Sequence, residues 1–144
     1  MVFRLIAVIF VVLVFNFEGK SQTLSDYKII GNGTGISSLT EAEVKSYFKG
    51  KYTLWKSGKS VKVVLHSSQS KHSATLAKLI FNTNQKGVQK YWMALVFQGR
   101  ANPPVFLDSD ASIVEYVAKT PGAIGIIDSD TGIGKCTQIQ IKNP

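Results

Sequence analysis

The sequence predicts an α/β sandwich, in which a mostly parallel sheet is flanked by helices. Short apolar runs rich in Val and Ile, at residues 61–65 and 123–127, are typical of buried strands. The stretches between such runs repeat their apolar residues at helical spacing. Strands that alternate with helices tend to pair in parallel, because each helix returns the chain to the same edge of the sheet.

Length and composition indicate one globular domain. The chain has 144 residues, of which 44% are hydrophobic and only 18% are charged, so it can bury a substantial core. Neither internal repeats nor an interdomain linker interrupts the pattern. We therefore expect a single domain over residues 22–144, preceded by a signal peptide at residues 1–21.

The signal peptide is predicted from an apolar run at residues 5–15 that follows Arg4. A bilayer span needs roughly 20 residues, so this run is too short to serve as an uncleaved anchor. Gly19 and Ser21 supply small residues at the positions that a signal peptidase recognises, which predicts cleavage before Gln22. The mature protein would then be periplasmic or secreted and would not span a membrane.

With Cys136 as its one cysteine, the chain can form no internal disulfide, and we expect this thiol to be buried and inert.

Charge is the second compositional signal. The net charge is +8, and loss of two basic residues and one acidic residue with the signal peptide leaves +7. A basic exported domain can attract small anions, acidic polymers or anionic lipid surfaces, whereas export argues against nucleic acid. An ordinary solvated surface remains the commoner alternative, because the basic residues are spread along the chain.

The first half of the mature chain has clear local signals. Residues 27–30 are typical of a strand and end in a glycine-rich turn at residues 31–35. Thr40 and Glu43 form a capping box, which predicts a helix that starts there and stops at Gly50. A loop with Trp55 at its centre follows over residues 51–59.

Patterns in the second half of the mature chain predict two more helices and two strands. After a turn at residues 82–87, apolar residues from Val88 to Val96 follow the pattern of an amphipathic helix. Residues 97–100 close this helix, and Pro103 and Pro104 prevent any continuation. Ser109 is placed to cap a further helix that ends near residue 120. Residues 123–127 form a buried strand, and residues 137–141 alternate strictly, which predicts an edge strand.

A polar loop at residues 66–70 joins the strand at 61–65 to a helix that we expect to begin at Lys71. The first amides of such a helix lack internal partners and carry the positive end of the helix dipole. Loops at the carboxyl ends of strands are also where α/β sheets bind ligands. The sequence thus predicts a small-anion site made by His66, Ser67, Ser68, Ser70, Lys71, His72 and Ser73, with the backbone amides of residues 71–73. The alternative is that Ser70 merely caps the helix.

Several ordered segments together resemble a known family. They are Ser38-Leu39-Thr40, Tyr47-Phe48-Lys49-Gly50-Lys51, Trp55-Lys56-Ser57-Gly58-Lys59, Tyr91-Trp92, Phe97-Gln98-Gly99, Pro103-Pro104 and Pro121-Gly122-Ala123-Ile124-Gly125. In this order and at similar spacing they resemble the phosphate-binding proteins of ABC transporters, of the type 2 periplasmic-binding superfamily. The likeness covers about residues 28–128 and is closest to the short, single-domain members.

The resemblance implies a single-lobe, periplasmic-binding-protein-like sandwich that binds inorganic phosphate or a similar small anion. It implies no catalysis and no cofactor, and its partner would be an ABC permease or another envelope protein. Two-lobed members carry an Arg before the equivalent helix, which falls at His66, and a Ser-Gly-Thr at the helix start, which falls at Ser70, Lys71 and His72. Lys71 and protonated histidines would supply the positive charge.

This chain differs from the two-lobed members at His66, Lys71 and His72, and it has room for only one lobe. A single lobe cannot enclose an ion, so we expect weak affinity unless a partner supplies a second wall. The rival hypothesis is an envelope protein-interaction domain, an accessory that keeps the lobe and has lost its ligand.

Other functional classes have little support. His66 and His72 lack the further ligands that zinc needs, and residues 128–132 lack two ligand positions of a calcium loop. No Gly-x-Ser-x-Gly nucleophile motif is present. We therefore assign neither catalytic residues nor metal ligands, and predict that the protein is not an enzyme.

Overall fold

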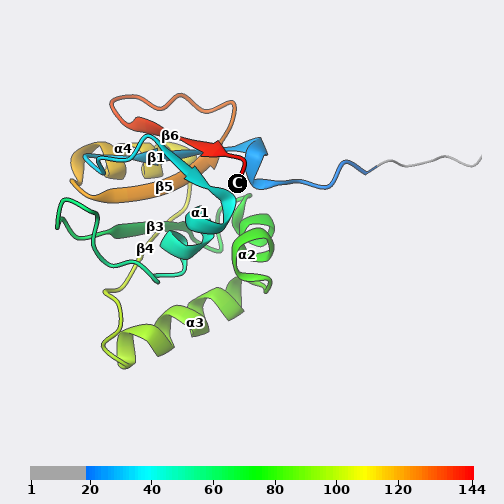
Figure 1. Cartoon of the computed structure of the whole chain (residues 1–144). Coiled ribbons are helices and arrows are strands. Elements are labelled where there is room, and N and C mark those ends of the chain that lie inside the picture. The colour runs from blue at the N-terminus through cyan, green and yellow to red at the C-terminus, as the bar shows by residue number, and fades with distance from the viewer. Residues whose placement is uncertain (1–18) are drawn as a thin grey trace, which may run out of the picture.

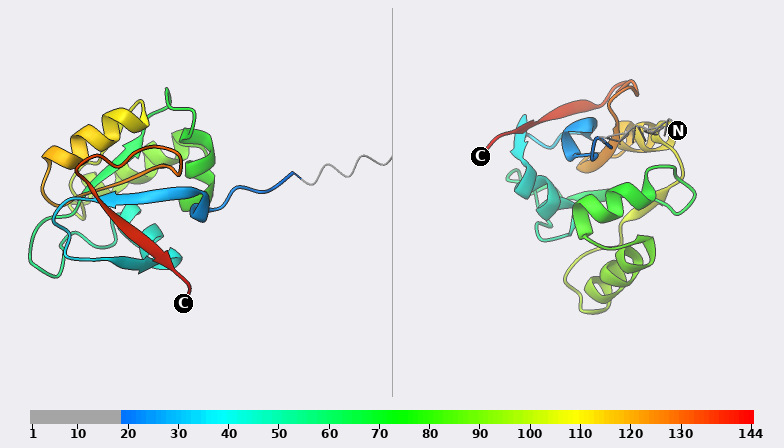
Figure 2. Two further views of the ribbon diagram at one scale, coloured as in Figure 1. Left: turned by 90° about the horizontal axis from the view of Figure 1, so that it is seen from above. Right: turned by 90° about the vertical axis from the view of Figure 1, so that its right-hand side faces the viewer.

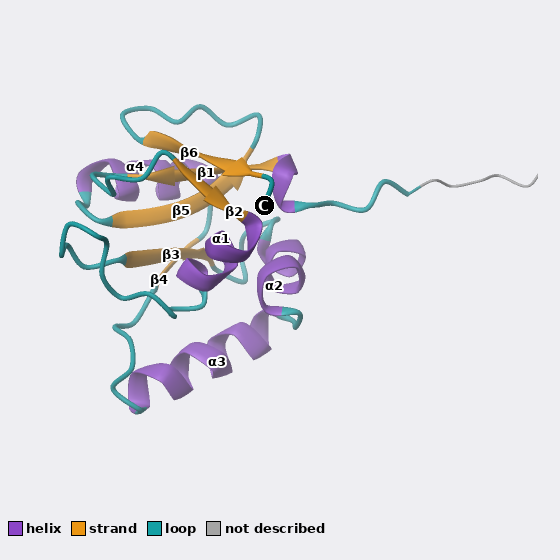
Figure 3. Cartoon of the chain, in the orientation of Figure 1, coloured by secondary structure: helices purple, strands orange, loops and turns teal. Residues whose placement is uncertain are grey.

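The computed structural model describes residues 19–144 and shows a six-stranded sheet flanked by helices, as predicted (Figures 1 and 3). The first eighteen residues of the predicted signal peptide lie outside the described part. In spatial order the strands are β2 (Ser38–Thr40), β6 (Thr137–Lys142), β1 (Tyr27–Gly31), β5 (Ala123–Asp128), β3 (Lys62–His66) and β4 (Val105–Leu107).

Strand pairing is parallel in three places and antiparallel in two. Strand β3 lies parallel to β4 and β5, and β2 lies parallel to β6. Strand β1 runs antiparallel to both of its neighbours, β5 and β6. The sheet is therefore mostly parallel, with one reversed strand near its middle.

Helices cover both faces of this sheet (Figure 2). Helices α1 (Glu41–Phe48), α2 (Ser73–Phe81) and α3 (Gln85–Phe97) contribute to the larger apolar core, and α4 (Asp110–Lys119) packs in a smaller core on the opposite face. A short 3₁₀ turn, η1 (Leu24–Asp26), precedes β1. Neighbouring strand residues alternate between the two cores: Val63 belongs to the larger and Val64 to the smaller. Burial on both faces explains why these strands are continuous apolar runs in the sequence.

Local capping signals were accurate for α1 and α4. The Thr40 amide donates to Glu43 Oε2 at 2.8 Å and the Glu43 amide donates to Thr40 Oγ1 at 3.2 Å, which confirms the capping box. Ser109 caps α4 by accepting from the Ser112 amide. Helix α3 starts three residues earlier than its apolar pattern suggested, because Asn84 accepts from the Gly87 amide and caps it.

The prediction of an edge strand at residues 137–141 was wrong. Strand β6 lies between β1 and β2, so its place in the sheet is internal. The edge positions belong to β2 and β4, which have three residues each and were not recognised as strands. Segments this short show too little alternation to be recognised from sequence.

The loop that contains Trp55 is hydrogen-bonded to the turn before β5. Its indole Nε1 donates to the Gly122 carbonyl at 2.9 Å, and the ring is buried against Tyr47 with centroids 4.6 Å apart. Cys136 is buried as expected, its thiol donates to the Val114 carbonyl, and burial raises the pKa of this thiol. Within residues 19–144, no helix has the length and apolarity to cross a membrane.

We predict that Gly122→Ala destabilises the protein more than Gly58→Ala. Both glycines have φ of +85°, which costs an L-residue about 1–2 kcal/mol. A Cβ at Gly122 would also lie 2.3 Å from the Ser60 carbonyl oxygen, whereas at Gly58 it would meet nothing within 4 Å. Urea unfolding should give a loss of about 3 kcal/mol for Gly122→Ala and about 1–2 kcal/mol for Gly58→Ala. Equal losses would contradict the close approach to Ser60.

Candidate functional site

The predicted site residues lie at the carboxyl ends of β3 and β5, where the sheet meets the N-terminus of α2. His66 is the last residue of β3, so the strand runs one residue further than predicted. A turn follows, and α2 begins at Ser73 rather than at Lys71. The seven residues of 66–73 that the sequence singled out are therefore close together, but they do not all face the same way.

His66 points into the protein and has both ring nitrogens hydrogen-bonded. Its Nε2 lies 2.8 Å from the Ile126 carbonyl oxygen and its Nδ1 lies 2.6 Å from Ser70 Oγ. Because a carbonyl oxygen only accepts, Nε2 carries the hydrogen. Burial lowers the pKa of His66, so the ring is neutral at pH 7 and its Nδ1 accepts from the Ser70 hydroxyl.

Ser70 holds the turn to β3 instead of capping α2. Its hydroxyl oxygen accepts from the His72 amide at 3.2 Å, and its carbonyl accepts from the Ser73 amide at 3.2 Å. His72 occupies the N-cap position of α2 and forms no side-chain cap hydrogen bond. The simple expectation that Ser70 caps the helix was therefore wrong, because its side chain is committed to His66 and to the His72 amide.

The start of α2 keeps unsatisfied donors. Among residues 19–144, the amides of Lys71, Ala74 and Thr75 have no hydrogen-bond acceptor, whereas those of His72 and Ser73 are satisfied by Ser70. Unsatisfied amides in the first turn of a helix, together with the helix dipole, attract negative charge. Lys71 is exposed beside them and adds a full positive charge.

The remaining two serines of the loop differ in role. The Ser67 hydroxyl donates to Asp108 Oδ1, and the Ser67 amide donates to the Leu107 carbonyl, so this residue ties the loop to the end of β4. Ser68 is exposed, and its hydroxyl makes no hydrogen bond within the described residues. Ser68 and Lys71 are thus the two predicted side chains that are available to a ligand in solution.

Two carboxylates that sequence analysis did not include lie against His72. The His72 Nε2 is 3.5 Å from Asp128 Oδ2 and 3.7 Å from Asp110 Oδ2. Asp110 Oδ2 also accepts from the Asp128 amide and the Thr131 hydroxyl, while its Oδ1 is 3.8 Å from His66 Nε2. Asp128 follows a predicted strand, and its place at a carboxyl end is the signal that could have identified it.

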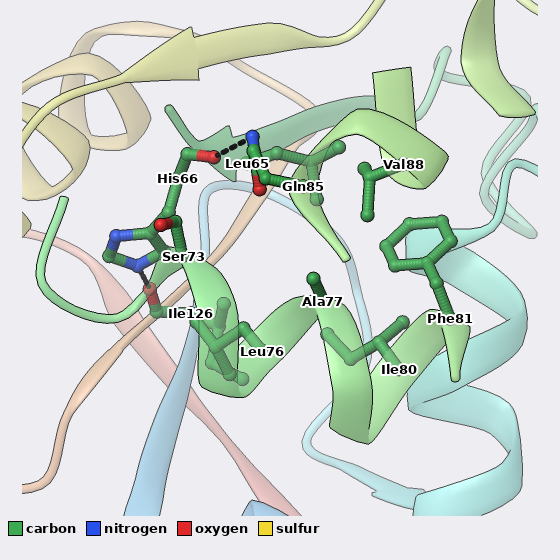
Figure 4. A pocket seen from close by; sticks show the side chains of 10 residues that line it. All are labelled: Leu65, His66, Ser73, Leu76, Ala77, Ile80, Phe81, Gln85, Val88 and Ile126. Carbon is green, nitrogen blue, oxygen red and sulfur yellow. Dashed lines mark hydrogen bonds between the residues drawn. The ribbon is translucent and has the colours of Figure 1, made fainter. Parts of the chain in front are cut away.

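A small cavity lies behind His66 and is shown in Figure 4. It has a volume of about 20 Å³ and is lined mainly by apolar residues of β3, α2 and α3, with Gln85 Nε2 donating to the His66 carbonyl at 3.0 Å. A space of this size holds about one water molecule, so a small ligand must bind on the outer side of the loop.

Over the described part of the chain, no group of three or more His, Cys, Asp or Glu side chains is arranged to hold a metal ion.

Comparison with known proteins supports the fold. No protein-family model matches the chain, and no curated protein matches it significantly. Among solved structures, the chain resembles PstS from Borrelia burgdorferi (TM-score 0.63, 14% identity, 82% of this chain and 47% of that one). It also resembles an ABC-type phosphate transport receptor from Vibrio cholerae (TM-score 0.61, 17% identity, 85% and 50%).

A third likeness is to a putative phosphate ABC transporter substrate-binding protein with bound phosphate from Clostridium perfringens (TM-score 0.57, 15% identity, 83% and 47%). The chain spans about half the length of the solved structures it matches. At these identities the likeness establishes the fold.

We predict that Ser70→Ala lowers stability while Ser68→Ala does not. Removing the Ser70 hydroxyl leaves His66 Nδ1 buried without a donor, which costs about 1–3 kcal/mol. Ser68 is exposed, so its loss should change stability by less than about 0.5 kcal/mol. Urea unfolding at pH 7 measures both values, and a Ser70→Ala variant as stable as wild type would contradict the described hydrogen bonds.

We predict that acidification destabilises the fold through His66. Burial holds the folded-state pKa of His66 below its usual value, while the unfolded chain titrates near about 6.5. As the pH falls below this value, the unfolded state takes up a proton that the folded ring refuses, so stability falls by up to about 1.4 kcal/mol per pH unit. Unfolding curves at pH 7, 6 and 5 should show this slope, and His66→Gln should reduce it. An unchanged slope in the variant would exclude His66 as its source.

Proposed function

We propose that this protein is an exported solute-binding module that holds phosphate or a similar small anion at the N-terminus of α2. The single observation that supports this most is the set of unsatisfied amides at Lys71, Ala74 and Thr75, at the start of α2 near the carboxyl ends of β3 and β5. The fold likeness to phosphate-binding proteins supports the choice of ligand class.

In this proposal the backbone supplies most of the contacts. The three amides donate to the anion's oxygens, the Lys71 ammonium neutralises its charge, and the Ser68 hydroxyl donates a further hydrogen bond. His66 and Ser70 act indirectly, because their mutual hydrogen bond fixes the turn that presents the amides. His72, at the N-cap of α2, lies with its ring against the carboxylates of Asp110 and Asp128.

The carboxylates of Asp110 and Asp128 make the site selective for protonated anions. They repel a fully ionised anion, but a protonated phosphate carries an O–H that can donate to a carboxylate oxygen. Sulfate has no such proton at neutral pH. The proposed site should therefore prefer phosphate to sulfate and bind it more tightly at pH 6 than at pH 8.

Affinity is expected to be weak for the isolated chain. The cavity behind His66 is too small to enclose an anion, so water competes at the surface of the loop. A second wall from an ABC permease or another envelope protein would exclude this water.

A second candidate function is an envelope protein-interaction domain that has lost its ligand. The observation that favours it is that two predicted ligand groups, His66 and Ser70, bond to each other inside the protein. A pull-down from envelope extracts, read alongside calorimetry, distinguishes this function from anion binding.

We predict that calorimetry detects phosphate binding at millimolar concentrations, and more weakly for sulfate. Lys71→Gln should weaken phosphate binding severalfold, because it removes the one exposed cation of the loop. Lys78→Gln is the matched control, since Lys78 lies in the last turn of the same helix and should not matter. No heat at millimolar phosphate at either pH 6 or pH 8 would refute the anion-binding proposal.

A further inference from the structure

Two large apolar side chains of α3 are exposed to an unusual degree. Phe97 has 84% of its surface exposed and Met93 has 57%, and they lie one turn apart. Beside them a groove of about 390 Å³ runs between the C-terminal half of α3 and the segment that leads to β4, with Val96, Pro103 and Pro104 among its lining residues. Exposed apolar surface of this kind costs free energy in water, so it is typical of a contact surface.

The same face of α3 carries two lysines. Lys86, Lys90, Met93 and Phe97 are all exposed and follow the spacing i, i+4, i+7 and i+11, which places them in one line on the helix. The opposite face holds Val88, Trp92 and Leu95, which are buried in the core. We call this line of four residues the α3 stripe: its N-terminal half is cationic and its C-terminal half is apolar.

The segment of the chain that contains the α3 stripe carries charge of one sign. No Asp or Glu occurs from Val44 to Leu107, while this part of the chain contains Lys45, Lys49, Lys51, Lys56, Lys59, Lys62, Lys71, Lys78, Lys86, Lys90 and Arg100. In Figure 1, α3 lies at the lower extremity of the molecule, away from α4 and the end of β5, which bear Asp110 and Asp128. Helix α3 thus exposes two large apolar side chains and contains no acidic residue.

We propose that the α3 stripe docks this protein onto an anionic lipid bilayer, with Met93 and Phe97 inserted among the lipids and Lys86, Lys90 and Arg100 against the headgroups. The main apolar face of α3 is buried in the core, but its exposed aromatic and thioether side chains beside basic ones have the chemistry of a membrane-surface element. A second copy of the chain is a poorer occupant, because it would bring lysine against lysine. Nucleic acid would satisfy the lysines but leave Phe97 and Met93 without apolar partners.

Vesicle co-sedimentation tests this directly, using the chain as recovered from its expressing cell, with its N-terminus determined by mass spectrometry. Wild type should bind vesicles that contain phosphatidylglycerol more tightly than pure phosphatidylcholine vesicles, and less tightly as salt rises from about 0.1 to 0.5 M. Phe97→Ser should weaken binding about tenfold, and the double substitution Lys86→Gln/Lys90→Gln by about fivefold for each lysine.

Matched controls separate the α3 stripe from general effects. Leu54→Ser removes another exposed apolar side chain, and Lys119→Gln/Lys135→Gln removes the same net charge from α4 and the loop before β6. Both controls should bind as wild type does. Comparing variants in one background also cancels any contribution of the apolar residues near the N-terminus.

Three outcomes would overturn the proposal. One is equal binding to anionic and neutral vesicles, or equal losses in the variants and their controls. Another is full binding by Phe97→Ser, which would indicate attraction of polyanions without insertion. The third is a wild-type dimer in sedimentation equilibrium that Phe97→Ser dissociates while vesicles do not bind, which would identify a second copy as the occupant.

Discussion

The hydrogen bonds of the His66 ring join β3 to β5, sixty residues away in the chain, and to the turn before α2. One ring nitrogen donates to the carbonyl of Ile126 on β5, and the other accepts from Ser70 in the turn before α2. The imidazole is itself part of β3, so one neutral ring fixes two adjacent strands and the start of a helix relative to each other. The Ser67 hydroxyl and amide tie the same turn to the end of β4, so both sets of hydrogen bonds position the unsatisfied amides at the start of α2.

Charge is distributed unevenly over this framework. The edge of the sheet where a ligand is proposed to bind carries Asp110 and Asp128 close to His72, although the chain as a whole is strongly basic. The segment from Val44 to Leu107, which includes α3, has eleven basic residues and no acidic one. Of these basic residues, only Lys71 belongs to the predicted anion site, while Lys86 and Lys90 lie on the exposed side of α3 and Arg100 follows its end.

Most of the fold, but only part of the site geometry, could be predicted from the sequence. Strands β1, β3 and β5 and helices α1 and α4 were predictable because burial on two faces and capping residues leave strong local patterns. Strands β2 and β4 were not, because three residues carry too little pattern, and missing β2 led to the wrong edge assignment for β6. The inward orientation of His66 depends on Ile126, sixty residues away, and the approach of Asp110 and Asp128 to His72 depends on how α4 packs. The residues next to His66 and His72 in the sequence form no pattern that indicates such long-range contacts.

The topology around β1 affects how the protein can reach its native state. Strand β1 is the first strand of the described residues, yet its two neighbours in the sheet are β5 and β6, the last two. The middle of the sheet cannot close until β5 and β6 are available, so the contact order is high and folding is expected to be slow. A chain with this order of strands cannot complete its sheet while β5 and β6 are still being made, and the export proposed above would need such an unfolded chain.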